Sequence, residues 1–326
     1  MRKATVMKRG SVLILVMCLF AFPLFSILPI DATPSENQIM IQFLYNAGVR
    51  IETSDVRIYI DPYTINANFS DYDADIILIT HPHEDHYNDA WVNALQKNDT
   101  VNIFPANMSE AIALHDGIGI NPGDSVLVGS VNITAFYMYT IAPEGFEPSH
   151  PAEANWTSYI IDINGFRIFH AGDSKNITEY DMLSGQIDVA LLPLGPGCQS
   201  MYNEEVVDAI QRISPDYFIP IHFAESADAT FIAAYGDDIE ESTECQIISL
   251  DNLEYYIWNI GPTKSTTSTT PSESSTTTTA TPTSSSTTTE TTTQSPDMIP
   301  IYLGAASAII VLVVVGVFIL RTRKVA

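Results

Sequence analysis

The chain has 326 residues, of which 46% are hydrophobic, 39 are acidic and 14 are basic. Seven of the basic residues lie in the first ten and last six positions, so residues 31–297 carry 7 basic and 39 acidic side chains, a balance of −32. This charge argues against a nucleic-acid-binding protein, which needs a basic surface, and against docking on anionic lipid. The acidic excess fits either a salty exterior or partial compensation by bound cations.

The first predicted element is a leader over residues 1–30. Residues 11–30 carry no charge and follow four basic residues, which is typical of a secretory signal peptide or an uncleaved signal anchor. We favour the signal peptide, because Pro23 and Pro29 would weaken a membrane-spanning helix.

The globular domain is predicted over residues 31–262. Short alternating or apolar runs between turn residues predict strands at 39–45, 48–53, 56–60, 75–80, 126–128, 131–137, 158–163, 166–170, 189–194, 217–221, 246–249 and 254–258. Helices are predicted at 89–96, 109–114 and 203–213. Strand meanders with interspersed helices indicate an α/β (α+β) domain with two β-layers and helices outside.

Two non-globular segments are predicted to follow. In the stalk, residues 263–297, 26 of the first 34 positions are Ser or Thr, a composition that cannot bury a core and that suits O-glycosylation. It resembles the stalks of archaeal surface proteins. The uncharged run 299–320 predicts a transmembrane helix over 298–321, with a cytoplasmic tail at 322–326. Basic residues flank both ends of the acidic body, so the positive-inside rule predicts a single-pass membrane protein with an extracellular body.

Glycosylation sequons and cysteines agree with export. Six N-x-Ser/Thr sequons lie in the acidic body, at Asn68, Asn98, Asn107, Asn132, Asn155 and Asn176. Outside the leader the chain has two cysteines, Cys198 and Cys245, which could pair outside the cell or stay apart.

A dense histidine cluster follows the predicted strand 75–80. Residues 81–86 read H-P-H-E-D-H and hold three of the seven histidines. Imidazoles and carboxylates cost free energy when they are buried without a partner. Imidazole nitrogen and carboxylate oxygen are the ligands of zinc and similar divalent metals. The cluster therefore predicts a metal site.

The pattern H-x-H-x-D-H at a strand end resembles the signature of the metallo-β-lactamase superfamily. Three later segments carry the same resemblance in the family's order: S-H-P at 149–151, H-A-G-D-S at 170–174 and P-I-H at 220–222. The similarity spans roughly residues 38–258 and is nearest to the hydrolases grouped with L-ascorbate-6-phosphate lactonase. It implies a four-layer αββα sandwich.

The resemblance also implies two divalent metal ions, expected to be Zn²⁺, with Mn²⁺ or iron as alternatives. The implied ligands are His81, His83 and His150 for the first ion, Asp85, His86 and His222 for the second, and Asp173 as the bridge. Three protein ligands leave a position open, which is typical of catalytic sites. Asp85 and His222 are the predicted catalytic residues, with Asp85 orienting the hydroxide that attacks the substrate.

Simpler readings exist for these residues. The histidines of 81–86, His150 and His222 could be ordinary loop residues, and Asp173 could cap a turn. We expect His170 to support Asp173 rather than to bind metal. His115 has no motif around it and is expected at the surface, while the Gly-rich loop 194–201 is expected near the substrate.

The predicted function is that of a cell-surface-tethered hydrolase for a small-molecule ester, lactone or phosphodiester. A lipid or nucleotide phosphodiesterase of the same superfamily is the enzymatic alternative. A true β-lactamase is disfavoured because the later segments resemble lactonases. From another class, the alternative is a non-catalytic metal-binding surface module that uses the fold as a scaffold.

Overall fold

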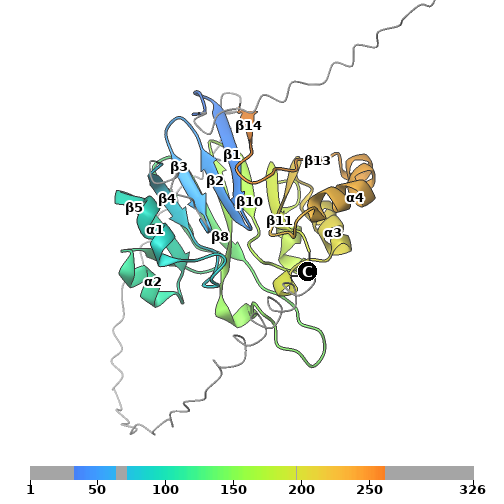
Figure 1. Cartoon of the computed structure of the whole chain (residues 1–326), viewed down its shortest axis with the longest axis horizontal. Helices are drawn as coiled ribbons and strands as arrows, with labels where there is room; N and C mark the ends of the chain where they lie inside the picture. Colours follow the sequence, from blue (N-terminus) through green and yellow to red (C-terminus); the bar gives the residue numbers. More distant parts are fainter. Residues whose placement is uncertain (1–32, 64–71, 196, 261–326) are drawn as a thin grey trace, which may run out of the picture. The chain divides into compact units, whose positions relative to one another are not determined.

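A computed structural model describes residues 33–63, 72–195 and 197–260 of the chain. These residues form two seven-stranded β-sheets with helices on their outer faces (Figure 1). The predicted leader, stalk and C-terminal helix lie outside the described residues. Within those residues, no helix is both long enough and apolar enough to cross a membrane.

In the first sheet, the last described strand pairs with the first. Its strands, in order across the sheet, are β14 (Tyr255–Asn259), β1 (Gln38–Tyr45), β2 (Gly48–Glu52), β3 (Arg57–Ile60), β4 (Ala74–Leu78), β5 (Gln96–Pro105) and β6 (Ile118–Ile120). The strands from β14 to β3 pair antiparallel, whereas β3 to β6 pair parallel. Parallel strands end at one edge of a sheet, and the histidine cluster follows β4 at that edge.

The second sheet combines a meander with a parallel half. Its strands, in order, are β13 (Gln246–Ile247), β12 (Tyr217–Ile221), β11 (Val189–Pro193), β10 (Phe166–His170), β9 (Thr157–Ile163), β8 (Val131–Tyr137) and β7 (Ser125–Val128). From β7 to β10 the pairs are antiparallel, and from β10 to β13 they are parallel. Asp173 and His222 follow β10 and β12 at the carboxyl ends of this parallel half.

Helices cover the outer face of each sheet (Figure 1). Helices α1 (Asp89–Leu95) and α2 (Ser109–Leu114) pack on the first sheet, and α3 (Asn203–Ile213) and α4 (Ala227–Thr243) pack on the second. Three short 3-10 helices lie in the connections: η2 (Ala152–Ala154), η3 (Thr178–Leu183) and η4 (Gly197–Gln199). Side chains alternate along each strand, so Ile76 of β4 packs between the sheets while its neighbour Ile77 packs under the helices. Burial on both faces explains the continuous apolar runs of the parallel strands.

The two-sheet α/β fold confirms the prediction, but three elements were missed. Strand β5 begins with polar residues that are half-buried or exposed, so its first half carries no strand pattern. Strand β6 has only three residues. Helix α4 buries only three of its 17 residues, Phe231, Gly236 and Ile239, so its apolar face is weakly marked in the sequence, whereas the 11-residue α3 buries Val206, Ala209, Ile210 and Ile213 at helical spacing.

The expectation that His115 lies at the surface was wrong. The residue is only 4% exposed and its ring stacks on Phe104, with ring centroids 6.0 Å apart. Its Nε2 lies 3.4 Å from a carboxylate oxygen of Asp89 at the start of α1. A histidine without a motif can therefore be a core residue that ties a helix to the sheet.

Candidate metal centre

The segment that leads into the histidine cluster is fixed to both sheets. After β4, the Ile79 N–H donates to the carbonyl of Ile103 in the first sheet, at 3.0 Å. The Ile79 carbonyl accepts from the Tyr159 hydroxyl of the second sheet, at 2.7 Å, and the Thr80 carbonyl accepts from the Thr157 N–H, at 3.1 Å. The backbone immediately before His81 is therefore held in place by hydrogen bonds to both sheets.

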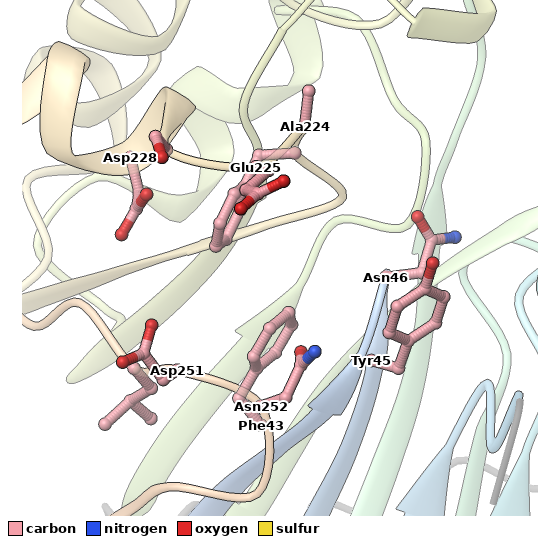
Figure 2. A pocket seen from close by; sticks show the side chains of 11 residues that line it. Phe43, Tyr45, Asn46, Ala224, Glu225, Asp228, Asp251 and Asn252 are labelled. Carbon is pink, nitrogen blue, oxygen red and sulfur yellow. The ribbon is translucent and has the colours of Figure 1, made fainter. Parts of the chain in front are cut away.

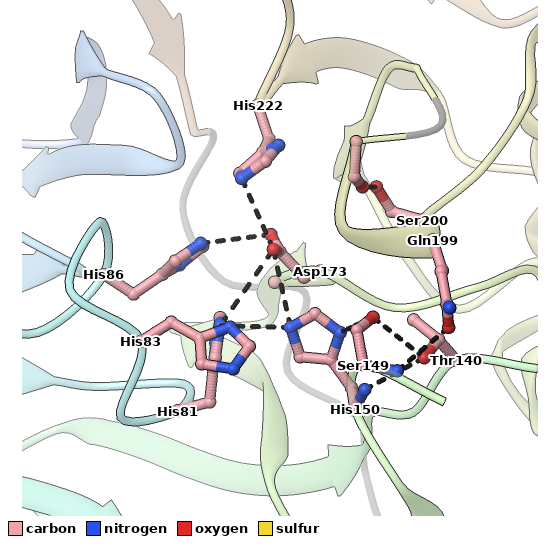
Figure 3. A network of polar contacts seen from close by, with 12 residues as sticks. His81, His83, His86, Thr140, Ser149, His150, Asp173, Gln199, Ser200 and His222 are labelled. Carbon is pink, nitrogen blue, oxygen red and sulfur yellow. Dashed lines mark hydrogen bonds and ion pairs between the residues drawn. The ribbon is translucent and has the colours of Figure 1, made fainter. Parts of the chain in front are cut away.

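Three imidazoles form a first group: His81, His83 and His150. His81 Nε2 lies 3.1 Å from His83 Nδ1 and 3.2 Å from His150 Nε2 (Figure 3). Two nitrogens on one tetrahedral zinc ion are about 3.3 Å apart, given a Zn–N distance near 2.0–2.1 Å. These separations therefore match ligands that share one ion.

Asp85, His86 and His222 form a second group. His222 Nε2 lies 3.3 Å from Asp85 Oδ2, and His86 Nε2 lies 3.8 Å from the same oxygen. The rings of His86 and His222 stack with their centroids 5.3 Å apart. In each group the candidate ligand atoms lie within 4.8 Å of one another.

Asp173 lies between the two groups (Figure 3). Its Oδ1 is 3.2 Å from His86 Nε2, and its Oδ2 is 3.3 Å from His222 Nε2 and 3.5 Å from His150 Nε2. The side chain is fully buried, yet neither oxygen accepts a hydrogen bond of good geometry from a described residue. Buried carboxylate oxygens without a donor are costly, and metal coordination is a chemistry that satisfies them.

A buried aspartate, Asp61, orients two of these histidines and was not predicted from sequence. It accepts from the Thr80 N–H at 2.8 Å, from the Thr80 hydroxyl at 2.6 Å and lies 2.8 Å from His86 Nδ1. Because the Thr80 hydroxyl donates its hydrogen bond to Asp61, its oxygen accepts a hydrogen bond from His81 Nδ1, 2.9 Å away. With Nδ1 as the donor, the Nε2 lone pair of His81 is free for a metal, and that of His86 would become available when a metal replaces its Nε2 proton.

The loop that carries His150 is held from the opposite side of the site. Gln199 of η4 accepts from the Ser149 N–H at 2.9 Å and donates to the Glu147 carbonyl at 3.1 Å. The Ser149 hydroxyl lies 3.0 Å from His150 Nδ1, and the Thr140 hydroxyl accepts from the His150 N–H at 3.0 Å (Figure 3). Gln199 lies in the Gly-rich loop, which therefore contacts a ligand loop.

Asn46, in the turn between β1 and β2, holds the second group. Its side-chain amide donates to Asp85 Oδ2 at 3.2 Å, and its carbonyl accepts from the His222 N–H at 2.7 Å. Both Asn46 and His222 have left-handed backbone angles, with φ of 56° and 51°. Asn tolerates this conformation better than most residues, but no metal-site signal marks such a turn in the sequence.

Electrostatics favour ionised carboxylates and, in the first group, neutral imidazoles. Burial and the neighbouring histidines lower the pKa of His81, and burial lowers the pKa of His150 to about 4. Burial opposes charge on His86, but Asp173 and Asp61 outweigh it and raise its pKa well above the usual value. The hydrogen bond with His222 lowers the pKa of Asp85. A buried cation between these carboxylates is the partner that such a field favours.

The structure brings all seven predicted ligand residues together. His170 stands apart from them: its Nε2 donates to the Ala47 carbonyl at 2.8 Å and its Nδ1 accepts from the Gly172 N–H at 3.2 Å. Both ring nitrogens are therefore used, and the residue supports the turn before Asp173. Cys245 is a free, buried thiol, and the side chain of Cys198 lies outside the described part of the chain.

Sequence comparisons connect this site to known proteins. Residues 40–222 match the family model of the β-lactamase superfamily domain. A UPF0173 protein of Pyrococcus abyssi is 32% identical over 177 residues, which cover 53% of this chain and 78% of the relative. A UPF0173 metal-dependent hydrolase of Thermococcus onnurineus is 29% identical over 206 residues, which cover 57% of this chain and 84% of the relative.

Solved structures share the fold. A crystal structure from Parabacteroides distasonis, 25% identical, gives a TM-score of 0.57 and covers 65% of this chain and 94% of its own. The metallo hydrolase Igni18 of Ignicoccus hospitalis, 19% identical, gives 0.56 and covers 68% and 98%. CmlA of Streptomyces venezuelae, a diiron β-hydroxylase of 14% identity, gives 0.54 and covers 70% and 55%. With its two-sheet fold, its candidate metal ligands and the match over residues 40–222, the chain belongs to the metallo-β-lactamase superfamily.

Proposed function

We propose that this protein is a metal-dependent hydrolase of esters or lactones whose centre holds two divalent ions. The observation that carries the proposal is the position of Asp173, whose two donor-free oxygens each face a different set of histidines. The donor set of imidazole nitrogen and carboxylate oxygen suits Zn²⁺, Mn²⁺ or iron. The bound ions would supply acidification of water and polarisation of the scissile carbonyl.

The residues of the chain would divide the remaining work. His81, His150 and the Asp61–His86 pair would fix the geometry of the centre, because these histidines are buried and hydrogen-bonded. Asp85, whose side chain is 40% exposed, can accept a hydrogen bond from the attacking water and orient it. His222 borders a cavity, so a substrate bound in that cavity would meet this ligand.

The test combines metal analysis with turnover on the purified full-length chain. We expect bound divalent metal, hydrolysis of generic esters or lactones, loss of activity with a chelator and recovery when the ion returns. The variant Asp173→Asn should be inactive under the same conditions. A chain that binds no metal would contradict the proposal. Two bound ions without hydrolysis over a broad panel of esters, lactones, amides and phosphodiesters would instead support the non-catalytic module.

We also propose that the hydrolase domain is displayed outside the cell. The support comes from the leader, the stalk, the apolar run 299–320 and the sequons. Four of the five sequons in the described part have exposed asparagines: Asn98, Asn107, Asn132 and Asn155. Protease treatment of intact cells should remove the domain, and its full protection would contradict the proposal.

A further inference from the structure

A cavity of about 590 Å³ adjoins the metal centre through His222, which forms part of its wall. The loop 223–227 and the first turns of α4, including Thr230, line one part of it. Leu194, Gly195 and Gly197, from the loop after β11, line another part. Because a ligand of the predicted centre lies in the wall, this cavity can hold the part of a substrate beyond the scissile bond.

A second cavity, of about 440 Å³, shares Asn46 and the loop 223–226 with the first. Figure 2 shows Glu225, Asp228 and Asp251 around it. Glu225 lines both cavities, and it is the one carboxylate among the described residues that line the 590 Å³ cavity. Among the residues that the structure describes, neither wall contains a lysine or an arginine.

The basic side chains of the domain are engaged elsewhere. Residues 31–262 hold six of them against 36 acidic side chains, and all six are described. Their polar partners are Glu52 for Arg50 and Arg57, Asp75 for Lys97, Gln186 for Arg167, Glu205 for Lys175 and Asp208 for Arg212. Residues 64–71, which are not described, contain no lysine or arginine.

The predicted centre itself would contribute little net charge. Two divalent ions would be balanced by Asp61, Asp85 and Asp173 together with one hydroxide. The sign of the field in the cavity is then set by its wall and by the acidic body around it. Low-dielectric walls of one charge sign concentrate that field and enrich ligands of the opposite sign.

We propose that the cavity selects substrates by charge: it favours esters or lactones that carry a protonated amine or a quaternary ammonium, with Glu225 as the residue that determines this preference. The inference rests on the proposed hydrolase function and narrows its substrate class. Anionic substrates, phosphorylated ones included, meet no cationic side chain in either wall. The chemical step remains hydrolysis, in which water adds to the carbonyl and the alcohol or thiol leaves with a proton.

The test uses two thioesters of nearly equal shape on the Zn²⁺-loaded full-length chain. Acetylthiocholine carries a quaternary nitrogen where 3,3-dimethylbutyl thioacetate has a carbon. We expect kcat/KM to favour the cation by roughly two- to fivefold at low salt, the size of one exposed ion pair. The ratio should fall towards one in 1 M NaCl, where the Debye length is about 3 Å. Equal or reversed preference at low salt would overturn the proposal.

Two variants and one binding measurement complete the experiment. Glu225→Gln should bring the ratio close to one, and an unchanged ratio would overturn the role of Glu225. Glu244→Gln, at the end of α4 and outside both walls, should keep the wild-type ratio. NMR titration with choline and with 3,3-dimethylbutanol measures the preference without turnover. If choline binds more tightly than 3,3-dimethylbutanol but no substrate is hydrolysed, the proposed function is contradicted and selection by charge is sustained. If the two ligands bind equally, selection by charge is overturned.

Discussion

The two halves of the candidate metal centre differ in how firmly they are held. In the first group, His83 is half-buried, but His81 and His150 are fully buried, and Thr80 and Ser149 each contact the ring nitrogen that faces away from the centre. In the second group, His86 is fully buried, but Asp85 is 40% exposed and His222 is 11% exposed, and His222 borders a cavity. The difference indicates that the first half anchors an ion while the second half meets the substrate.

The largest loss of metal binding and activity is expected from substitution of Asp173, the residue that both halves share. Asp173→Asn removes the charge that lies between both groups, so we expect both ions to bind more weakly. Activity should fall by more than the roughly 10–100-fold that loss of a supporting residue costs. Metal content after dialysis and kcat/KM measure the two effects. A variant that keeps two ions at wild-type affinity would remove Asp173 from the centre.

Truncation of one ligand in each half tests the comparison directly. His150→Ala should weaken the anchored ion, and His222→Ala should weaken the ion at the cavity while the anchored ion stays bound. Stepwise removal with increasing chelator, followed by metal analysis, separates the two. Equal chelator sensitivity of the remaining ion in both variants would show that the halves do not differ.

Asp61→Asn should damage the support of both halves. The substituted amide has a single oxygen, so it cannot accept all three hydrogen bonds that the carboxylate accepts from the Thr80 N–H, the Thr80 hydroxyl and His86. We expect metal affinity to fall by about 10–100-fold, and stability to fall by about 1–3 kcal/mol because buried donors lose their acceptor. Chemical denaturation and metal titration measure these losses. Asp55→Asn, in the exposed turn before β3, is the matched control and should change neither.

A smaller effect is expected for the clamp on the His150 loop. Gln199→Ala removes the hydrogen bonds to Ser149 and Glu147, which should weaken the anchored ion by about 1 kcal/mol, or roughly fivefold. The Co²⁺ absorption spectrum of the anchored site should shift as well. Gln186→Ala is the control, because Gln186 also donates to a backbone carbonyl but lies outside the site. Equal behaviour of the two variants would leave Gln199 without this role.

The smallest effect is a pH dependence of stability expected from Cys245, which lies in the core under α3 and α4. Burial raises the pKa of its thiol to about 12 from an ordinary value of 9.0, so the folded protein keeps it protonated at pH 8. Stability should fall only as pH rises above 9, where the unfolded thiol ionises and the folded one does not. Ellman's reagent should not label Cys245 at pH 8, with or without chelator. Labelling after chelation would show that metal removal opens the helical layer as well as the centre.

Sequence reasoning identified the ligands better than their supports. His81, His83, Asp85 and His86 stand out because four metal-binding side chains follow one apolar strand, and His222 stands out after another. Asp61, Asn46 and Gln199 carry no such signal, because single polar residues after a strand or in a turn are common and usually cap or solvate the backbone. Their roles depend on contacts between residues far apart in the chain: Asp61 with His86 across 25 positions, Asn46 with Asp85 across 39 and Gln199 with Glu147 across 52.

The sequence by itself determined the chemistry that this protein can hold. Residue type and position after apolar strands are local properties, and they were enough to predict two β-layers and a metal site at residues 81–86. The resemblance to the metallo-β-lactamase superfamily then implied the full set of seven candidate ligands. The tertiary structure decided how those ligands are oriented and what surrounds them. Which ring nitrogen of His86 faces the centre follows from its hydrogen bond with Asp61, 25 positions away. The charge of the cavity wall follows from loops that only folding brings together.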